Sequence, residues 1–212
     1  MKQKGILIAL EGGEGAGKTT QLERLTKQFN KIGKNIISVR EPGGTIISEQ
    51  IRTIVLSNKN TGMKGITEVL LFQAARAQIY SEIVIPALKA GKIVLMDRTR
   101  DSSVVYQGMV RGFGRKLVEQ LNDISTQETE PDLTILLDVD VKIGLGRRNG
   151  TGNMNRLDLE NGSFHRKVRS SYLKLAKENQ NNRWVIINAN QTEDEVEKAL
   201  WKVLRKRFKL YF

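Results

Sequence analysis

A glycine-rich segment near the start of the sequence has the residue types needed to bind the phosphates of a nucleotide. The segment Gly12–Thr19 reads GGEGAGKT and fits the pattern G-x-x-x-x-G-K-[ST]. Glycines let backbone N–H groups converge on phosphate oxygens, the lysine adds a positive charge, and the last hydroxyl can bind Mg²⁺. The apolar run Ile6–Leu10 precedes the segment and a helical pattern, Thr19–Ile32, follows it, as a P-loop requires. The residues expected to bind the nucleotide are Gly12, Gly13, Glu14, Gly15, Ala16, Gly17, Lys18, Thr19 and Thr20.

A carboxylate at the end of another apolar run could hold the metal ion of such a site. Asp97 follows the run KIVLM and Asp138 follows the run ILL, so both are candidates. We favour Asp97, because the adjacent Arg98 could bind a phosphate through two N–H groups. The expected metal ligands are therefore Thr19 and Asp97, and Asp138 is expected to belong to a turn or helix cap.

Five short runs rich in Ile, Val and Leu predict the strands that position these residues. The runs do not alternate with polar residues, which is typical of parallel strands buried on both faces. Longer segments with helical spacing lie between them, and this alternation favours a three-layer, doubly wound α/β fold around a five-stranded parallel sheet. The expected strands are Ile6–Leu10, Asn35–Val39, Lys92–Met96, Leu133–Leu137 and Trp184–Ile187. The expected helices are Thr19–Ile32, Thr67–Ala90, Phe164–Ala176 and Thr192–Leu204.

Three local features are expected to modify this pattern. Pro86 should kink or end the helix around Ile83–Leu88, because proline lacks the backbone N–H that a helix interior needs. The stretch Gly144–Gly152 (GLGRRNGTG) breaks helical periodicity and is expected to be a mobile loop. The single histidine, His165, is expected to be a partly exposed helix residue without a catalytic role.

Length and composition limit the class of protein. A chain of 212 residues suits one α/β domain, and the absence of cysteine excludes a disulfide framework, a thiolate zinc site and a cysteine nucleophile. The net charge of +12 favours partners that carry phosphate, without choosing among nucleotides, nucleic acid and an anionic membrane. No apolar run approaches the roughly 18 residues of a transmembrane helix, and no signal peptide is visible, so a cytoplasmic location is expected.

A missing motif and the short chain disfavour two classes of P-loop protein. A GTPase should also carry the guanine-reading motif Asn/Thr-Lys-x-Asp, which this sequence does not contain. The chain is also short for a mechanical ATPase. A small kinase is therefore the favoured class.

Beyond the P-loop, the sequence resembles the bacterial thymidylate kinase family over most of its length. The matching motifs, in family order, are Glu11–Thr20, Arg40–Thr45, Phe72–Arg76, Asp97–Gly108 and Asn155–Asp158. The resemblance implies an ATP- and Mg²⁺-dependent kinase that converts dTMP to dTDP, for dTTP synthesis and DNA replication. It also implies one nucleoside-monophosphate kinase domain over residues 1–212, with an acceptor-binding region at about 41–108 and a LID at about 144–158.

The resemblance assigns the acceptor dTMP to a set of residues outside the P-loop. Phe72 is expected to stack on thymine, Arg76 to bond the thymine O4 edge, and Arg52 and Arg98 to face phosphate groups. The stretch that ends at Gln107 is expected to read the N3 edge of thymine and exclude ribose. The expected dTMP-binding residues are Glu41, Pro42, Arg52, Phe72, Arg76, Arg98, Ser102, Ser103, Tyr106 and Gln107.

The same resemblance implies which residues act on the transferred phosphate. Lys18, Arg98 and Glu14 are expected to be catalytic, with Glu14 organising the surroundings of the acceptor. Phosphoryl transfer depends mostly on positioning and charge stabilisation, so arginines are expected rather than a nucleophilic side chain. Positions 14–16 carry no basic residue, so the resemblance is to the type with a catalytic arginine in the LID. Of the LID arginines Arg147, Arg148 and Arg156, the candidates are Arg147 and Arg156.

One departure from the family motif leaves other functions open. Thr99 stands where the family usually has an aromatic residue after Asp-Arg, which could admit other monophosphates. The alternatives are a nucleoside or nucleoside-monophosphate kinase with another acceptor and, motivated by the net charge, a nucleic-acid-binding P-loop ATPase. The expected partners are ATP, dTMP and a second copy of the chain, with no membrane and no specific nucleic acid. The dimer contact is expected on the apolar faces of Thr67–Ala90 and Asp101–Val110.

Overall fold

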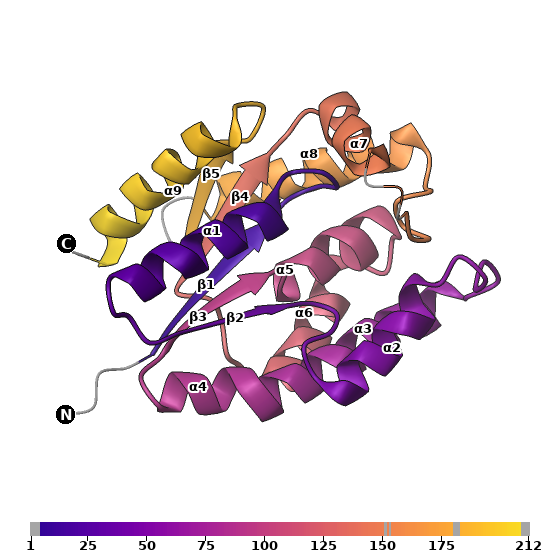
Figure 1. The fold of residues 1–212 in the computed structure, drawn as a ribbon. Helices are drawn as coiled ribbons and strands as arrows, with labels where there is room; N and C mark the ends of the chain where they lie inside the picture. Colours follow the sequence, from indigo (N-terminus) through magenta and orange to yellow (C-terminus); the bar gives the residue numbers. More distant parts are fainter. Residues whose placement is uncertain (1–4, 151, 153, 180–182, 209–212) are drawn as a thin grey trace.

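A parallel sheet with helices on both faces forms the centre of the molecule (Figure 1). The computed structural model describes residues 5–150, 152, 154–179 and 183–208. The sheet has five strands in the order β2-β3-β1-β4-β5, and every neighbouring pair is parallel. The strands are β1 (Ile6–Glu11), β2 (Ile36–Arg40), β3 (Ile93–Asp97), β4 (Leu133–Asp138) and β5 (Trp184–Asn188). The predicted doubly wound α/β fold and all five predicted strands are confirmed.

The helical elements cover the sheet and connect its strands. They are α1 (Lys18–Lys31), α2 (Ile46–Leu56), α3 (Gly65–Ile79), the π-helical segment η1 (Tyr80–Val84), α4 (Ile85–Lys89), α5 (Arg100–Ser103), the π-helical segment η2 (Val104–Val110), α6 (Arg115–Thr126), α7 (Val141–Asn149), α8 (Gly162–Glu178) and α9 (Glu193–Phe208). Four predicted helices correspond to α1, to α3 through α4, to α8 and to α9.

The three central strands are buried on both faces, as their apolar runs predicted. In β1, β3 and β4 nearly every residue is buried. The prediction was wrong for β2 and β5, in which several residues are half-buried or exposed. These two strands lie at the edges of the sheet, where only one neighbouring strand covers them.

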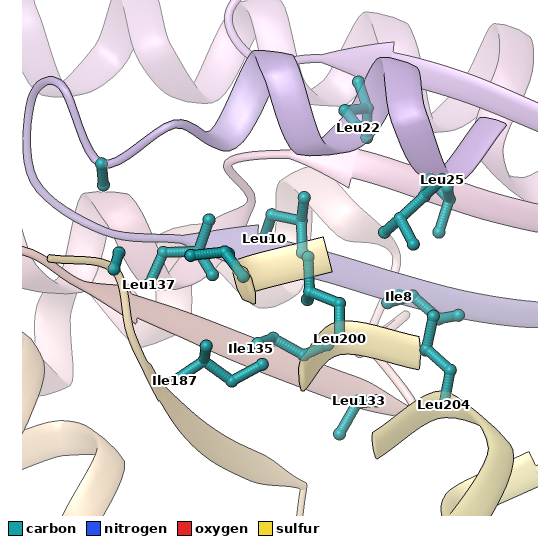
Figure 2. Packing of buried hydrophobic residues seen from close by; sticks show 14 of the residues in the cluster. Ile8, Leu10, Leu22, Leu25, Leu133, Ile135, Leu137, Ile187, Leu200 and Leu204 are labelled. Atoms are coloured by element: carbon teal, nitrogen blue, oxygen red, sulfur yellow. The ribbon is translucent and has the colours of Figure 1, made fainter. Parts of the chain in front are cut away.

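The main core lies between one face of the sheet and the helices α1 and α9 (Figure 2). Leu25 of α1 and Leu200 of α9 are fully buried, and they pack against Leu10 of β1 and Ile135 of β4. The opposite face carries two further clusters. One lies under α3, η1 and α4, and the other under η2, α6 and α8. Because both faces are packed, the position of the strand ends is fixed, and the functional residues follow those ends.

The long helix predicted over Thr67–Ala90 is divided into three elements by Pro86. The α-helical hydrogen bonding of α3 ends at Ile79, and the wider π-helical turn η1 leads into α4, where Pro86 lies in the first turn. Proline donates no backbone hydrogen bond, and a π-helical turn just before it accommodates that loss without ending the helical path. Pro86 therefore changes the hydrogen bonding and does not stop the helix.

The prediction of an irregular loop over Gly144–Gly152 was wrong as far as Asn149. The helix α7 runs through Gly144, and Asp140 caps its N-terminus by accepting a 2.9 Å hydrogen bond from the Lys142 backbone N–H. A Cβ added at Gly144 would overlap the backbone oxygen of Glu14. This glycine therefore serves a close backbone approach between α7 and the P-loop. Within the expected LID, Thr151 and Asn153 lie outside the described residues.

The expectation that His165 is partly exposed was wrong, and the burial of Asp101–Val110 does not favour the dimer contact expected there. His165 is only 4% exposed, because it lies on the face of α8 that packs inward and its ring meets Phe164 edge-on. The segment expected to offer a dimer contact, Asp101–Val110, is mostly buried within the chain. Val104 and Val105 belong to the cluster under α8, so their side chains are not available to a second copy.

Candidate functional site

A cleft of about 770 Å³ runs along the carboxyl edge of the sheet. This is where doubly wound sheets bind ligands, because loops from several parallel strands end there together. The cleft gathers almost all of the predicted site residues, from the P-loop, the loop after β2, α3, the end of β3 and η2. The predicted site residues that do not line it are Gly12, Gly13 and Arg156.

Within the cleft, the P-loop and the first turn of α1 form the phosphate-binding end. Gly17 has a left-handed backbone (φ 85°) immediately before α1, a conformation that glycine adopts without strain. The buried Lys18 Nζ donates hydrogen bonds to the carbonyl oxygens of Gly12 (3.2 Å) and Gly13 (2.9 Å). Burial lowers the pKa of Lys18, and the neighbouring charge of Arg98 lowers it further. The lysine is thus held against the loop on which phosphate oxygens would lie.

Two oxygen-bearing side chains that could hold a magnesium ion, Thr19 and Asp97, lie in the same cleft as this lysine. Thr19 Oγ1 donates a 2.6 Å hydrogen bond to Asp97 Oδ2, and both residues line the cleft. A hydroxyl and a carboxylate at this place suit Mg²⁺, which uses few protein oxygens and takes its other ligands from water and phosphate. Asp138 lies outside the cleft lining, and Arg169 binds its carboxylate at 2.7 and 3.1 Å. The geometry thus favours Asp97 over Asp138 for this role.

Arg98 and Glu14 form an ion pair at the middle of the cleft. Arg98 Nη2 donates to Glu14 Oε1 at 2.7 Å, and the Tyr106 hydroxyl donates to the same oxygen at 2.9 Å. Burial would raise the pKa of Glu14, but the charges of Arg98 and Lys18 outweigh it and lower the pKa to about 2. Arg98 has φ 67°, which is rare for a residue with a side chain, and such strain is often found at functional positions.

Glu11 is a buried acidic residue that the sequence analysis quoted in a motif but assigned no role. Its carboxylate accepts hydrogen bonds from the backbone N–H and hydroxyl of Thr99, from Ser102 Oγ and from Tyr172 Oη, at 2.7–3.0 Å. Burial raises the pKa of Glu11, and the nearby Arg98 opposes that rise. The signal that could have found it is its position directly after the first apolar run, the same signal that singled out Asp97. Tyr172 has no comparable signal, because it falls in the apolar stripe of its helix.

Thr99, the departure from the family motif, does not enlarge the cleft. The residue is fully buried and does not line the cleft. Its hydroxyl is bonded to Glu11, and its carbonyl oxygen accepts a 3.1 Å hydrogen bond from Arg76 Nη2. The Thr99 side chain is therefore directed to Glu11 and not to the cleft.

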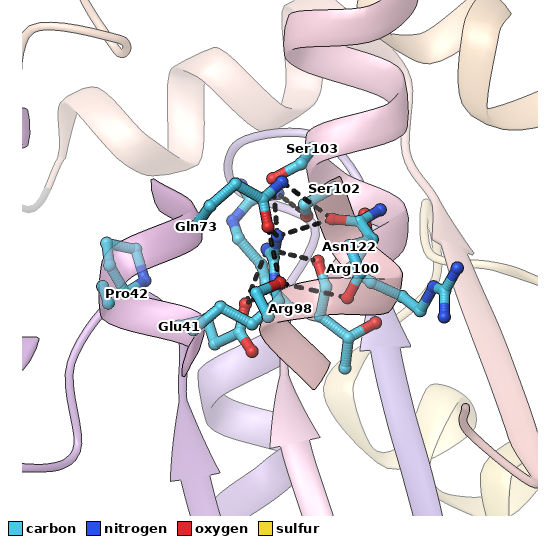
Figure 3. A network of polar contacts seen from close by, with 12 residues as sticks. Glu41, Pro42, Gln73, Arg98, Arg100, Ser102, Ser103 and Asn122 are labelled. Carbon is cyan, nitrogen blue, oxygen red and sulfur yellow. Dashed lines mark hydrogen bonds and ion pairs between the residues drawn. The ribbon is translucent and has the colours of Figure 1, made fainter. Parts of the chain in front are cut away.

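The acceptor end is organised by a buried arginine, Arg76 of α3, which is only 2% exposed. Every nitrogen of its guanidinium has an acceptor within the protein. The acceptors belong to Glu41, Gln73, Thr99, Ser103 and Asn122, and Figure 3 shows this network. Burial raises the pKa of Glu41, and the charge of Arg76 opposes the rise. A bond from Arg76 to thymine, which the resemblance implies, would therefore share a donor that already has a partner.

Other predicted acceptor residues surround this network. Phe72 and Gln107 line the cleft, and Gln107 Nε2 donates a 2.9 Å hydrogen bond to Glu68 Oε1. Arg52 also lines the cleft and donates a 2.7 Å hydrogen bond to the carbonyl oxygen of Pro42. The sequence analysis did not identify Glu68, which is buried in the first turn of α3 and can be found only from the contacts of the fold.

Two of the LID arginines line the cleft at different places. Arg147 donates to the carbonyl oxygens of Ala189 (2.9 Å) and Gln191 (3.3 Å), in the loop after β5. Arg148 also lines the cleft and binds the Asp158 carboxylate at 2.8 Å, and this hydrogen bond raises the pKa of Arg148. Arg147 thus contacts the loop after β5, whereas Arg148 is bound to Asp158 within the expected LID.

The third LID arginine, Arg156, lies outside the cleft lining. Its Nη2 forms a 2.7 Å ion pair with Glu68 and donates a 2.9 Å hydrogen bond to the carbonyl oxygen of Val55. Its backbone N–H donates to the carbonyl oxygen of Leu56, so this part of the LID is attached to the end of α2. In this structure Arg156 faces the acceptor elements rather than the P-loop.

The comparisons with known proteins show the family of the chain. A family model described as thymidylate kinase matches residues 10–200. The chain belongs to the thymidylate kinase family. It is 48% identical over 195 residues to a thymidylate kinase of Geobacillus sp. (strain WCH70), covering 91% of this chain and 92% of that protein. It is 47% identical over 195 residues to a thymidylate kinase of Clostridium novyi (strain NT), covering 91% of this chain and 95% of that protein.

A solved structure supports the same assignment at the level of the fold. The crystal structure of thymidylate kinase from Ehrlichia chaffeensis superposes with a TM-score of 0.77 at 32% sequence identity, covering 95% of this chain and 99% of the other. As a member of the thymidylate kinase family, the chain is a kinase that transfers a phosphoryl group from ATP to dTMP. This confirms the activity predicted from sequence and disfavours the alternative kinases and the ATPase. No helix in the described part of the chain is long and apolar enough to cross a membrane.

Proposed function

We propose that this thymidylate kinase family member binds ATP and dTMP at opposite ends of its cleft, with the transferred phosphate between Lys18 and Arg98. The observation that carries the proposal is that one cleft contains both the P-loop and the acceptor residues Phe72 and Gln107. The Arg98–Glu14 ion pair lies between these two ends. Positive groups held at this place can stabilise the charge that develops on the transferred phosphate.

The ATP end extends from the P-loop to the loop after β5. Ala189, Gln191 and Thr192 line this part of the cleft, and Arg147 donates to two of their carbonyl oxygens. We expect these groups to surround the base of ATP, since the carboxyl end of a parallel strand is a common nucleotide-binding position. Arg147 fixes this loop through these two hydrogen bonds, and substitution tests whether it also acts on the phosphate.

Thr19 and Asp97 are proposed to hold Mg²⁺ together with the ATP phosphates. Two observations support this assignment. Both side chains offer oxygen atoms, which Mg²⁺ prefers as ligands, and Thr19 Oγ1 lies 2.6 Å from Asp97 Oδ2. Mg²⁺ held there would neutralise charge on the phosphates of ATP. Asp97 orients the Thr19 hydroxyl, and Lys18 adds a further positive charge at the same end.

We propose that one arginine of the LID acts on the transferred phosphate, and that substitution can identify which one. Arg147 and Arg156 are the candidates from sequence, and Arg148 is added as a third because it also lines the cleft. The arginine that acts on the phosphate should lower kcat when replaced by alanine, with the KM for dTMP unchanged. Parallel measurements on the Arg147→Ala, Arg148→Ala and Arg156→Ala variants compare the three directly.

A homodimer is proposed from exposed apolar side chains on two neighbouring helices. Ile66 and Leu70 of α3, and Leu117 and Ile124 of α6, are 42–77% exposed. Since α3 and α6 pack together, these side chains could bury one another against a second copy. Sedimentation velocity should give a dimer for the wild type and a monomer for Leu70→Glu.

We also propose a cytoplasmic location, because ATP and dTMP are metabolites of that compartment.

The experiment that tests the activity is ADP formation from Mg²⁺-ATP with single acceptors. The acceptors are dTMP, dUMP, dCMP, dGMP, UMP and thymidine, with a control lacking any acceptor. Turnover with dTMP well above all others is expected, because Thr99, the departure from the family motif, is buried and does not line the cleft. Turnover that needs no acceptor, or none with dTMP, would overturn the proposal.

A further inference from the structure

Glu68 joins the LID to the residue that is expected to read the acceptor base. Its side chain is only 3% exposed, and it lies in the first turn of α3. Its carboxylate accepts a 2.9 Å hydrogen bond from Gln107 Nε2 and forms a 2.7 Å ion pair with Arg156. Arg111 approaches the same carboxylate at 3.4 Å. None of the roles described above uses this group, although it is a buried charge at the edge of the acceptor site.

The bond to Glu68 fixes which end of the Gln107 amide is available to a ligand. An ionised carboxylate can only accept hydrogen bonds, so the NH₂ end of the amide must face Glu68. Gln107 Oε1 has no protein donor among the described residues, and Gln107 lines the cleft. The amide can therefore offer a ligand its carbonyl oxygen, which is an acceptor.

The charge of Glu68 is maintained by its surroundings. Burial of the carboxyl would raise its pKa, but the hydrogen bond from Gln107 and the charges of Arg111 and Arg156 outweigh it and lower the pKa. Arg156 is in turn held by the carbonyl oxygen of Val55 at 2.9 Å. The LID segment thus supplies part of the charge that keeps Glu68 an obligatory acceptor.

We propose that Glu68 is a positioning residue that makes Gln107 a hydrogen-bond acceptor and so selects bases with an N–H at position 3. Thymine and uracil carry a hydrogen on N3, whereas N3 of cytosine carries a lone pair that would face the lone pairs of Oε1. A rotated amide could donate to cytosine, but rotation would turn Oε1 toward the Glu68 carboxylate. This inference rests on the proposed function, in which Gln107 faces the acceptor base.

The test is the ratio of kcat/KM for dTMP to kcat/KM for dCMP in the wild type and in Glu68→Gln. A glutamine at position 68 can accept from or donate to Gln107, so both amide orientations become possible. We expect the ratio to fall by about tenfold or more, mainly through a higher KM for dTMP, because a site built around a fixed hydrogen bond discriminates strongly against the wrong partner. A role limited to stability would lower both activities together and leave the ratio unchanged.

The matched control is Glu160→Gln, which removes the other carboxylate bound by Arg111, at 2.6 Å, without touching Gln107. Its ratio should equal that of the wild type.

If Glu68→Gln folds poorly, as judged by its unfolding midpoint, the double variant Glu68→Gln with Gln107→Glu provides a second test. In that variant the amide at position 68 can donate to the carboxylate at position 107. The other oxygen of this carboxylate again faces the cleft as an acceptor, and a ratio near that of the wild type is expected.

The outcomes separate this inference from the proposed function. A wild type without dTMP kinase activity would overturn the proposed function. An active wild type whose ratio is unchanged in a folded Glu68→Gln variant would overturn only the role of Glu68. A double variant that is active but does not discriminate would also overturn it.

Discussion

The ATP end and the acceptor end of the cleft are built in different ways. At the ATP end, Lys18 is held by the carbonyl oxygens of Gly12 and Gly13, which lie six and five positions away in the sequence. At the acceptor end, Arg76 is held by Glu41 and Asn122, which lie 35 and 46 positions away. Phosphate binding can therefore be built into one short segment, because backbone N–H groups do most of it. Base recognition uses side chains, and the orientation of each depends on partners from other elements.

The largest effect is expected when the ATP end is altered alone. Lys18→Ala should lower kcat by about 10³-fold or more, because the positive charge nearest the transferred phosphate is removed. The affinity for dTMP, measured by calorimetry, should not change, since Lys18 makes no contact with the acceptor network. Lys31→Ala, an exposed lysine in the last turn of the same helix, is the control. A parallel loss of dTMP affinity would show that the two ends are not independent.

At the acceptor end, the expected effect is on folding as well as on binding. Arg76→Leu should lower the free energy of unfolding by about 3–5 kcal/mol, because Glu41 would remain buried without its ion-pair partner. Urea unfolding measures this change. The control is Arg115→Leu, which breaks exposed ion pairs and should cost less than about 1 kcal/mol. A stable Arg76→Leu variant that has lost dTMP binding would instead make Arg76 mainly a substrate ligand.

The two strand-end aspartates allow a finer comparison at the ATP end. Asp97→Asn should lower kcat by about 10²-fold and raise the Mg²⁺ concentration needed for half of the maximal rate, because the metal loses a charged ligand. Asp138→Asn should leave both quantities within about twofold of the wild type. Initial rates over a Mg²⁺ titration measure both variants. Equal effects of the two substitutions would contradict the assignment of the metal site to Asp97.

The smallest expected effect concerns the pH dependence of stability at the middle of the cleft. The pKa of Glu14 is lowered to about 2, so its ion pair stabilises the folded state above its ordinary pKa of 4.5 and is lost as pH falls toward 2. Glu14→Gln should flatten the pH dependence of the unfolding midpoint over that range, by an amount corresponding to on the order of 2 kcal/mol. Glu119→Gln, in an exposed ion pair, is the control. An unchanged slope in Glu14→Gln would indicate that other groups govern acid unfolding.

Much of the fold could be predicted because it depends on local patterns. Apolar runs of four or five residues identified every strand, since buried parallel strands must be apolar along their whole length. The pattern could not show that β2 and β5 lie at the edges, because strand order is decided by packing between distant segments. The helix at Val141–Asn149 was missed for a related reason. Its glycines weaken the helical signal, yet Gly144 is needed where α7 approaches the P-loop.

The sequence by itself determined the phosphate-binding loop, the paired Thr19 and Asp97, and membership of the family. Motifs of this kind are readable because their chemistry depends on neighbouring residues or on the end of a strand. Only the tertiary structure decided that His165 is buried, that Arg156 faces Glu68 and that the Arg76 guanidinium is fully bonded within the protein. The physical reason is that the burial and partners of a charged side chain depend on elements that come together only when the sheet and its helices have packed.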